Sequence, residues 1–535
     1  MSSKAAYCAV AEPGIAVQAR SFAREGEGDI LVTHNEAPML TRRNFVSMAC
    51  APGLARAARR RKPNLLYLLA DDHAGYVLGA DGNRMAQTAN LDRLAGEGVR
   101  FAGHYCNSPV CTPSRQSFFT SLMPHAAGVT VLGTALRDDR PTLARQLSAS
   151  GYRTAVIGKM HFNAPGRAGL HGFDVARTED VVQKEWSAWA GPHADWGEVR
   201  TKPAWRPFRD PARIWLNADK LPYPRAYAQM KGTWVAQQAA AFLAEHRSDP
   251  FALWVSFTEP HSPFDFPVEA RNDFDPARFT PPTVGPEDGR QIPLIFRELS
   301  NSDKQGIIAA YYSSVRYLDR NIGVVLDALR RLDLENDTLV VYMADHGYCL
   351  GQHGRFEKHC SYDPALRVPL IFRLPGRLRP RVVRDFTESI DVPPTIVELL
   401  GAERFAVNHG QSLVPYLKGA RPARPRSSTF AEYLENEEAC VRTAKWKFVH
   451  SSGRRARTDG YKTDHPTPGR IVRLYDLEAD PGEFHNVAAE HPEVVRELSR
   501  AMLGRFRTTH PEAAQAPAME DADAIEWYLR PRDAV

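Results

Sequence analysis

Unbroken apolar runs alternate along this chain with stretches in which apolar residues recur at helical spacing. The first run, Pro63–Ala70, is apolar from Leu65 onward, which predicts a strand buried on both faces, as in parallel sheets. Comparable runs predict strands at 153–158, 251–257, 338–344 and 369–373. Helices are predicted between them, the longest over 303–332. This alternation predicts an α/β fold whose mixed, mostly parallel sheet is flanked by helices.

The pattern changes near residue 420. Arg421–Arg426 is rich in arginine and proline, which indicates a boundary, and short apolar runs follow at 441–443, 446–449 and 472–477. A terminal helix is predicted around 493–505. We therefore expect a smaller C-terminal α+β domain over 416–535, built from an antiparallel sheet and a helix. It would follow a large domain over 61–415 and an N-terminal extension over 1–60.

Composition narrows the function classes. The net charge of +5 is modest for 535 residues, and no basic stripe is interleaved with aromatic residues, so we expect no nucleic-acid partner. No apolar run is long enough to cross a bilayer, so we expect no transmembrane segment. The seven cysteines include no Cys-x-x-Cys pair, which argues against a zinc site and a disulfide scaffold. Cys349 and Cys360 can pair only if the fold brings them together, and we expect free thiols packed as small apolar groups.

The N-terminal extension contains a candidate targeting signal. Arg42-Arg43, followed by a short and weakly apolar stretch, resembles a twin-arginine export signal. On this interpretation the mature protein begins near Arg61 and is periplasmic or secreted. The alternative is a basic tail on a cytoplasmic protein, because the apolar stretch is short and is broken by Pro52 and Arg56.

Polar side chains follow the predicted strands at the point where each strand ends. Because the carboxyl ends of parallel strands meet at one edge of a sheet, we expect these side chains to gather there. They are Asp71, Asp72, Lys159, His161, His261, Asp345 and His346, with Lys358 in the loop after the last pair. Converging carboxylates repel one another, so the cluster predicts a hard divalent cation such as Ca²⁺ or Mg²⁺. Taken alone, each acidic pair would be explained as a strand-end turn.

The segment Cys111–Arg115, with the sequence Cys-Thr-Pro-Ser-Arg, predicts a loop that turns into a helix. Pro113 is favoured in a first helical turn, and Cys111 would then lie at the positive end of the helix dipole. Arg115 adds a planar donor fork suited to tetrahedral oxyanions. The alternative for Cys111 is a buried structural cysteine beside a proline-rich turn.

This pentad resembles the Cys-x-Pro-Ser-Arg signature of the type I sulfatases, which belong to the alkaline phosphatase-like superfamily. The resemblance continues in the family's order over about residues 61–515, through the Gly-Lys-x-His and Pro-His-x-Pro motifs to a closing hairpin at Leu474–Glu483. It implies a catalytic domain over 61–415. The implied metal ligands are Asp71, Asp72, Cys111, Asp345 and His346, and the implied catalytic residues are Cys111, Arg115, Lys159, His161, His261 and Lys358.

The resemblance also implies a mechanism. A formylglycine-generating enzyme would oxidise Cys111 to 3-oxoalanine (formylglycine), whose hydrate, with Ca²⁺ (Mg²⁺ or Mn²⁺ as alternatives), attacks the sulfur of a sulfate monoester. Lys159 and Lys358 would stabilise charge on the sulfate oxygens. His261 would protonate the leaving alcohol, with Lys358 as the rival, and His161 would orient the nucleophile or accept a proton.

Two departures from the family pattern leave the substrate open. His346 stands where many arylsulfatases have Asn, and Glu357 stands where many members have Gly. The residues from about 175 to 230 predict a long irregular insertion that forms a specificity wall, with tryptophans at 186, 189, 196, 205 and 215. We expect a sulfated carbohydrate as substrate. The alternatives are a choline-sulfatase-like activity, a phosphonate monoester or phosphodiester hydrolase, and a non-enzymatic binder of sulfated glycans.

Overall fold

The computed structural model describes residues 62–163, 170–192, 197–200, 210–454, 460–463, 469–519 and 521–533. All of them belong to one compact unit, Arg60–Val535. The predicted export signal and the predicted mature terminus near Arg61 lie outside the described residues. The boundary between residues 415 and 416 stays a prediction.

A mixed, mostly parallel sheet is the centre of the described chain, and it confirms the predicted fold class. Its eight strands, counted over the described residues, run in the order β5-β4-β6-β1-β7-β8-β2-β9. All neighbouring pairs are parallel except those made by β8, which is antiparallel to both β7 and β2. The strands are β1 (Asn64–Ala70), β2 (Val99–Phe101), β4 (Arg153–Gly158), β5 (Val175–Arg177), β6 (Phe251–Ser256), β7 (Thr338–Ala344), β8 (Leu370–Arg373) and β9 (Arg381–Val383).

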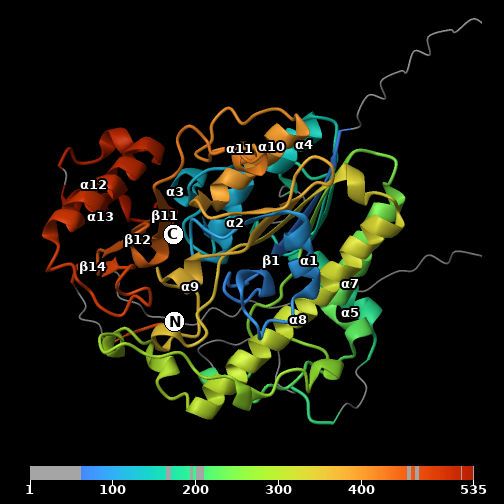
Figure 1. The fold of residues 1–535 in the computed structure, drawn as a ribbon, viewed down its shortest axis with the longest axis horizontal. Helices are drawn as coiled ribbons and strands as arrows, with labels where there is room; N and C mark the ends of the chain where they lie inside the picture. Colours follow the sequence, from blue (N-terminus) through green and yellow to red (C-terminus); the bar gives the residue numbers. More distant parts are fainter. Residues whose placement is uncertain are drawn as a thin grey trace, which may run out of the picture. The chain divides into compact units, whose positions relative to one another are not determined.

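Helices cover both faces of this sheet, as Figure 1 shows for the labelled helices. Alternate residues of β1 point to opposite sides: Leu66 packs with one set of helices and Leu65 with the other. The first set is α1 (Ala89–Glu97), α5 (Glu179–Ala190), α7 (Lys231–Glu245) and α8 (Asn301–Arg331). The second set is α2 (Cys111–Thr120), α4 (Leu143–Ala149) and α10 (Val392–Leu400). The central strands are therefore buried on both faces, as their apolar runs predict.

The insertion over 175–230 is more regular than predicted. It begins with β5 at the sheet edge, continues as α5, and later forms the short helix α6 (Ala212–Trp215). Val182 and Trp186 bury one face of α5 in the core, which explains why this segment is helical. The prediction of an irregular segment was wrong here, while Trp196 and Trp205 lie outside the described residues.

A second, antiparallel sheet in the described residues has the order β11-β12-β13-β14 and confirms the predicted C-terminal α+β element. The side chains of Phe430, Phe448 and Leu474 pack against Met502 and Phe506 of α12. These elements are β11 (Ser428–Tyr433), β12 (Glu438–Thr443), β13 (Trp446–Ser451), β14 (Ile471–Asp476), α12 (Pro492–Thr509) and α13 (Ala522–Tyr528).

Short elements join the two sheets. The described residues include α3 (Pro124–Ala127), α9 (Asp363–Leu366), α11 (Val414–Leu417) and a two-stranded pair of β3 (His104–Tyr105) with β10 (Thr387–Glu388). The ammonium of Lys447 on β13 is fully buried, and it pairs with Asp363 of α9 at 2.8 Å and with Glu483 at 2.6 Å. This ion-pair cluster links the smaller sheet to the segment between β7 and β8.

The surface and the helices add two further observations. None of the helices in the described ranges combines the length and the apolar character that crossing a bilayer requires.

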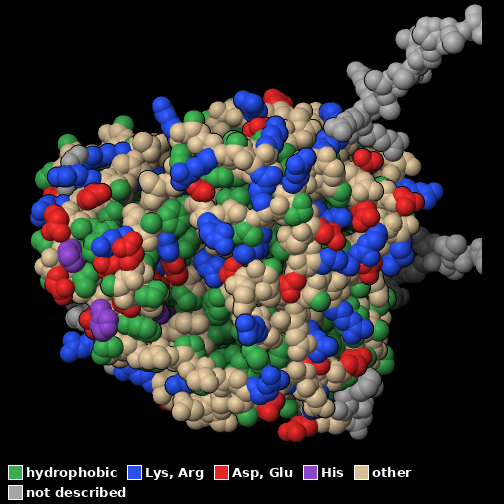
Figure 2. All heavy atoms as spheres, in the orientation of Figure 1, with side chains coloured by type: hydrophobic (Ala, Val, Ile, Leu, Met, Phe, Trp, Pro, Cys, Tyr) green, Lys and Arg blue, Asp and Glu red, His purple; other side chains and the backbone are tan. Residues whose placement is uncertain are grey.

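On the face drawn in Figure 2, basic and acidic side chains are interspersed.

Candidate active site

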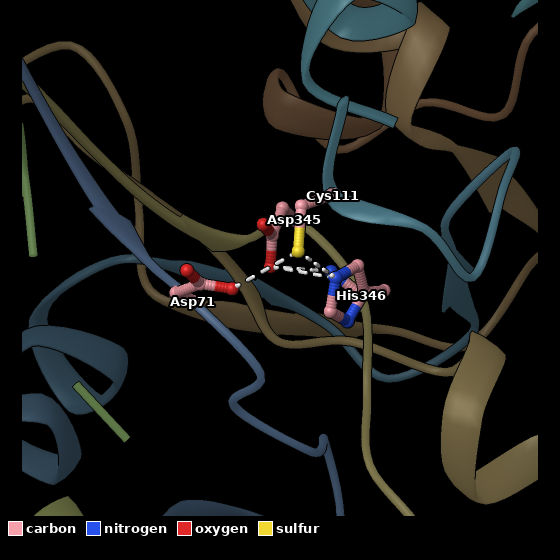
Figure 3. A group of neighbouring side chains, drawn as sticks. All are labelled: Asp71, Cys111, Asp345 and His346. Atoms are coloured by element: carbon pink, nitrogen blue, oxygen red, sulfur yellow. Dashed lines mark hydrogen bonds and ion pairs between the residues drawn. The ribbon is translucent and has the colours of Figure 1, made fainter. Parts of the chain in front are cut away.

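Four buried side chains converge at the carboxyl ends of β1 and β7, and Figure 3 shows them pointing toward one another. Asp71 follows β1, Asp345 and His346 follow β7, and Cys111 is the first residue of α2. Each is at most 2% exposed. The ligand atoms of these four residues all lie within 4.8 Å of one another, and Asp71, Asp72, Cys111 and His261 form a second such group. The predicted gathering at one edge of the sheet therefore occurs.

The donor set suits a metal ion. Asp72 Oδ2 is buried and has no hydrogen-bond partner among the described residues, so one carboxylate oxygen is left for an additional ligand. Burial raises the pKa of Asp345 to about 6, against the opposing charge of Arg115. A divalent cation would relieve this crowding of acids, and carboxylate oxygens are the ligands that hard cations prefer. The described residues thus form a possible metal-binding site.

Cys111 is surrounded by cationic groups. Its Sγ lies 3.2 Å from His346 Nε2 and accepts from Lys358 Nζ at 3.3 Å. Burial would raise the pKa of the Cys111 thiol, but Lys159, Lys358 and His346 hold it well below its ordinary value. An anionic group is therefore favoured at the start of α2, as the helix dipole also requires.

The two lysines predicted from sequence reach the site from different loops. Lys159, directly after β4, pairs with Asp71, and Lys358 pairs with Asp72 at 2.8 Å. Burial would lower the pKa of both ammonium groups, but the nearby carboxylates and Cys111 raise it. Both side chains therefore carry positive charge beside Cys111.

Arg115 holds the carboxylates in place. The side chain is fully buried, and its Nε donates to Asp345 Oδ2 at 2.8 Å while a terminal nitrogen lies 3.6 Å from Asp71 Oδ2. Another terminal nitrogen donates to Ser256 Oγ at 2.9 Å and to the Lys159 carbonyl. Two of the three guanidinium nitrogens thus donate to protein groups, while the other terminal nitrogen has no hydrogen-bond partner among the described residues. The interpretation of Arg115 as a donor to a tetrahedral oxyanion stays a prediction.

The two histidines are held by different local contacts. The chain turns after β4, where His161 has a φ of 54°. The backbone N–H of His161 donates to Glu179 at 2.5 Å, and its Nδ1 lies 3.3 Å from Thr112 Oγ1. His261 donates from Nδ1 to the Ser262 carbonyl at 2.7 Å, which fixes its ring.

A cavity of about 1010 Å³ opens beside these groups. Five of the six predicted catalytic residues line it: Cys111, Lys159, His161, His261 and Lys358. Trp186 of the insertion also lines it, whereas Trp215 packs in the core and Trp189 is 44% exposed. The insertion therefore contributes to the cavity wall through one of its described tryptophans.

Residues 63–402, more than half of the chain, match the family model described as Sulfatase. The chain belongs to the sulfatase family. It is therefore a hydrolase of sulfate esters, as the resemblance implies. Residues 351–508 match a second model, described as the C-terminal region of N-sulphoglucosamine sulphohydrolase.

Comparison with individual proteins agrees with this assignment. The sulfatase is 29% identical to choline-sulfatase of Rhizobium meliloti over 88% of this chain and 91% of that protein. It is 27% identical to Δ4,5-hexuronate-2-O-sulfatase of Bacteroides thetaiotaomicron over 85% of this chain and 90% of the relative. The structure of a phosphonate monoester hydrolase from Silicibacter pomeroyi superposes with a TM-score of 0.71 at 23% identity, covering 85% of this chain and 97% of the other. This last likeness concerns the fold alone.

Three residues of the sulfatase site were not found from the sequence. Ser256 accepts from Arg115 and donates to the Lys159 carbonyl, and Glu179 positions His161. Glu259 lines the cavity at 6% exposure, its Oε2 has no hydrogen-bond partner among the described residues, and burial raises its pKa to about 7. A polar residue at the end of an apolar run, and an acid two positions before His261, are the signals that could have marked Ser256 and Glu259.

Proposed function

We propose that this sulfatase cleaves sulfate monoesters of a carbohydrate at Cys111, with formylglycine at that position and a divalent cation, Ca²⁺ before Mg²⁺ or Mn²⁺. The observation that carries the proposal is the surroundings of Cys111. Its Sγ lies within 3.6 Å of Asp71 and within 3.3 Å of His346 and Lys358, at the head of α2 and on the cavity wall.

The groups around position 111 then have distinct roles in the proposed reaction. Formylglycine would supply a hydrated aldehyde as nucleophile, and an ion held by Asp71, Asp72, Asp345 and His346 would supply positive charge that lowers the pKa of a hydroxyl. Lys159 and Lys358, whose side chains are at most 10% exposed, would present ammonium groups to the sulfate oxygens, and burial strengthens the effect of such charges. Because Asp71 and Asp72 orient these ammonium groups, little reorganisation is needed during the reaction.

His261 is proposed to protonate the leaving alcohol. Its Nδ1 donates to the Ser262 carbonyl, so Nε2 is the nitrogen that can exchange a proton with a bound ester. The ring lines the same cavity as Cys111 and Lys159. Lys358 is the rival acid, but its pKa is raised well above its ordinary value by Asp72 and Cys111 despite burial, which makes it a poor proton donor.

Replacing His261 by Ala tests this role. Sugar sulfates with poor leaving groups should lose about 10²–10⁴-fold in kcat/KM, because the departing alkoxide then lacks a proton donor. 4-Nitrophenyl sulfate should lose much less, since its leaving group needs no proton. Steady-state kinetics on both esters measures the difference, with His491→Ala, a 40% exposed residue directly before α12, as the control. Equal losses on both esters would show that His261 is not the general acid.

A zwitterionic small ester, as in a choline-sulfatase-like activity, is the second candidate substrate. It is favoured by the composition of the cavity wall, which includes the buried carboxyl of Glu259 and the aromatic side chains of Trp186 and Tyr223. Carboxyl and aromatic groups are the kinds of side chain that bind an ammonium group. Sulfate esters and phosphonate monoesters both carry one negative charge, so charge alone does not separate these two classes.

Matched substrates separate the alternatives. The enzyme is produced together with formylglycine-generating machinery, and its bound metal is removed with a chelator. Ca²⁺, Mg²⁺ or Mn²⁺ is then added back. Each form is assayed on 4-nitrophenyl sulfate and on a 4-nitrophenyl phosphonate ester, which have the same leaving group. We expect the higher kcat/KM for the sulfate and, among natural esters, for a sulfated sugar over choline sulfate. A preference for the phosphonate would contradict the proposed activity, and a preference for choline sulfate would replace the carbohydrate by the second candidate.

Export and maturation complete the proposal. Arg42-Arg43 and the weakly apolar stretch after it support twin-arginine export to the periplasm or beyond. Oxidation of Cys111 requires a formylglycine-generating enzyme as a partner during synthesis. The proposal of export rests on the sequence, because residues 1–61 are outside the described part of the chain.

A further inference from the structure

The loop between β7 and α9 holds two buried cysteines close together. It begins with Asp345 and His346 and carries Lys358, so it supplies three of the groups around Cys111. Cys349 is fully buried, Cys360 is 5% exposed, and their Sγ atoms are 3.8 Å apart. Both thiols are free in the structure and belong to a small apolar cluster with Tyr362, Ala365 and Tyr475.

Backbone hydrogen bonds bring the two cysteines together. The Cys349 N–H donates to the Glu357 carbonyl at 2.8 Å, and the Gly351 N–H donates to the Arg355 carbonyl at 2.8 Å. These bonds fold the segment back on itself, so that Cys360, three residues after Glu357, returns to Cys349. A disulfide has an S–S distance of about 2.05 Å, so the two sulfurs must approach by less than about 2 Å, which rotation about χ1 of the two cysteines can supply. Cys106, by contrast, donates its thiol to the Ala365 carbonyl.

We propose that Cys349 and Cys360 form a disulfide when the protein is in an oxidising compartment. In this step the two thiols give up two protons and two electrons and gain an S–S bond. An external disulfide such as oxidised glutathione accepts them by thiol–disulfide exchange and becomes two thiols. The bond closes a short loop that contains Lys358, whose ammonium contacts Asp72 and Cys111. The disulfide would therefore link the segment that carries the catalytic ammonium group of Lys358 to the segment that carries Asp345 and His346.

The reaction should be slow in the fully folded protein. The hydrogen bond with Cys360 and burial raise the pKa of Cys349 well above its ordinary value, so few thiolates are present to attack an oxidant. Formation is expected during folding or transient opening of the loop. The experiment therefore has to give the loop the opportunity to open.

Full-length protein is equilibrated with oxidised or reduced glutathione in a urea concentration just below the unfolding transition, then quenched with acid, unfolded and alkylated. Peptide mass spectrometry without reduction should show Cys349 linked to Cys360 and alkylated Cys440. After urea removal, the oxidised form should melt about 2–5 °C above the reduced form, because the crosslink restricts the unfolded chain. Cys360→Ser should abolish this difference, and Cys440→Ser, a buried single cysteine, should retain it.

Other outcomes would overturn the proposal. Equal alkylation of Cys349 and Cys360 after oxidation and after reduction would contradict it, and so would a crosslink between Cys349 and a different cysteine. A melting difference that persists in Cys360→Ser would assign the effect to another group. Each result is independent of which ester the enzyme cleaves, so the proposal does not stand or fall with the substrate.

Discussion

Replacing Cys111 by Ala is expected to lower kcat on 4-nitrophenyl sulfate by about 10⁴–10⁶-fold. Alanine has no sulfur that can be oxidised and no oxygen that can attack, while the side chains that surround position 111 stay in place. Lys358 and His346 would still face the position, so substrate binding should change less than turnover. Steady-state kinetics of the variant measures turnover and substrate binding, and mass spectrometry of the peptide carrying residue 111 measures the modification at that position. The parent peptide should contain an aldehyde or its hydrate.

Cys106→Ala is the matched control for this prediction. Cys106 precedes the helix by five positions, is fully buried, donates to the Ala365 carbonyl and is absent from the described cavity wall. Its replacement should leave turnover within a few-fold of the parent while costing some stability through a small cavity. If Cys111→Ala kept substantial activity, or if fully active enzyme carried an unmodified thiol at position 111, the proposed nucleophile would be wrong.

The sheet was predictable because its strands are buried on both faces. A strand such as β7 has no solvent-facing side, so its apolar run is continuous and its limits, Thr338–Ala344, coincide with the predicted ones. Segment α5 carried a weaker signal, because Val182 and Trp186 are buried while two other apolar residues of the helix, Val181 and Trp189, are exposed. Its helix depends on packing against the sheet, which the local pattern does not contain.

The sequence allowed us to predict which residues form the active site, but not most of the contacts between them. Strand ends and the pentad placed Cys111 and the acids together, since parallel strands deliver their carboxyl ends to one edge. The role of Arg115 depends on Asp345, which is 230 positions later, and that pairing is set by the tertiary fold. The same holds for Glu179 with His161 and for the approach of Cys349 to Cys360.

Arg115→Ala is expected to cost about 3–5 kcal/mol of unfolding free energy and nearly all activity. The side chain is fully buried between Asp71 and Asp345, so its removal leaves two buried carboxylates with less compensating charge. Urea unfolding followed by tryptophan fluorescence, in a chelator that removes bound cations, measures the stability term. In the presence of chelator, only the chain's own charges compensate the buried carboxylates. The loss of unfolding free energy in Arg115→Ala should therefore be largest under this condition.

Arg93→Ala is the control, because the Arg93–Asp327 pair is 3.9 Å long and both side chains are at least 40% exposed. An exposed pair of this kind contributes less than about 1 kcal/mol. Arg115→Lys should fall between the two, since lysine keeps the charge but cannot contact Asp345, Ser256 and the Lys159 carbonyl together. If Arg115→Ala unfolded at the same urea concentration as Arg93→Ala, the carboxylates would not depend on Arg115. Added Ca²⁺ should stabilise the parent, and a larger gain in Arg115→Ala would show that cation and guanidinium neutralise the same acids.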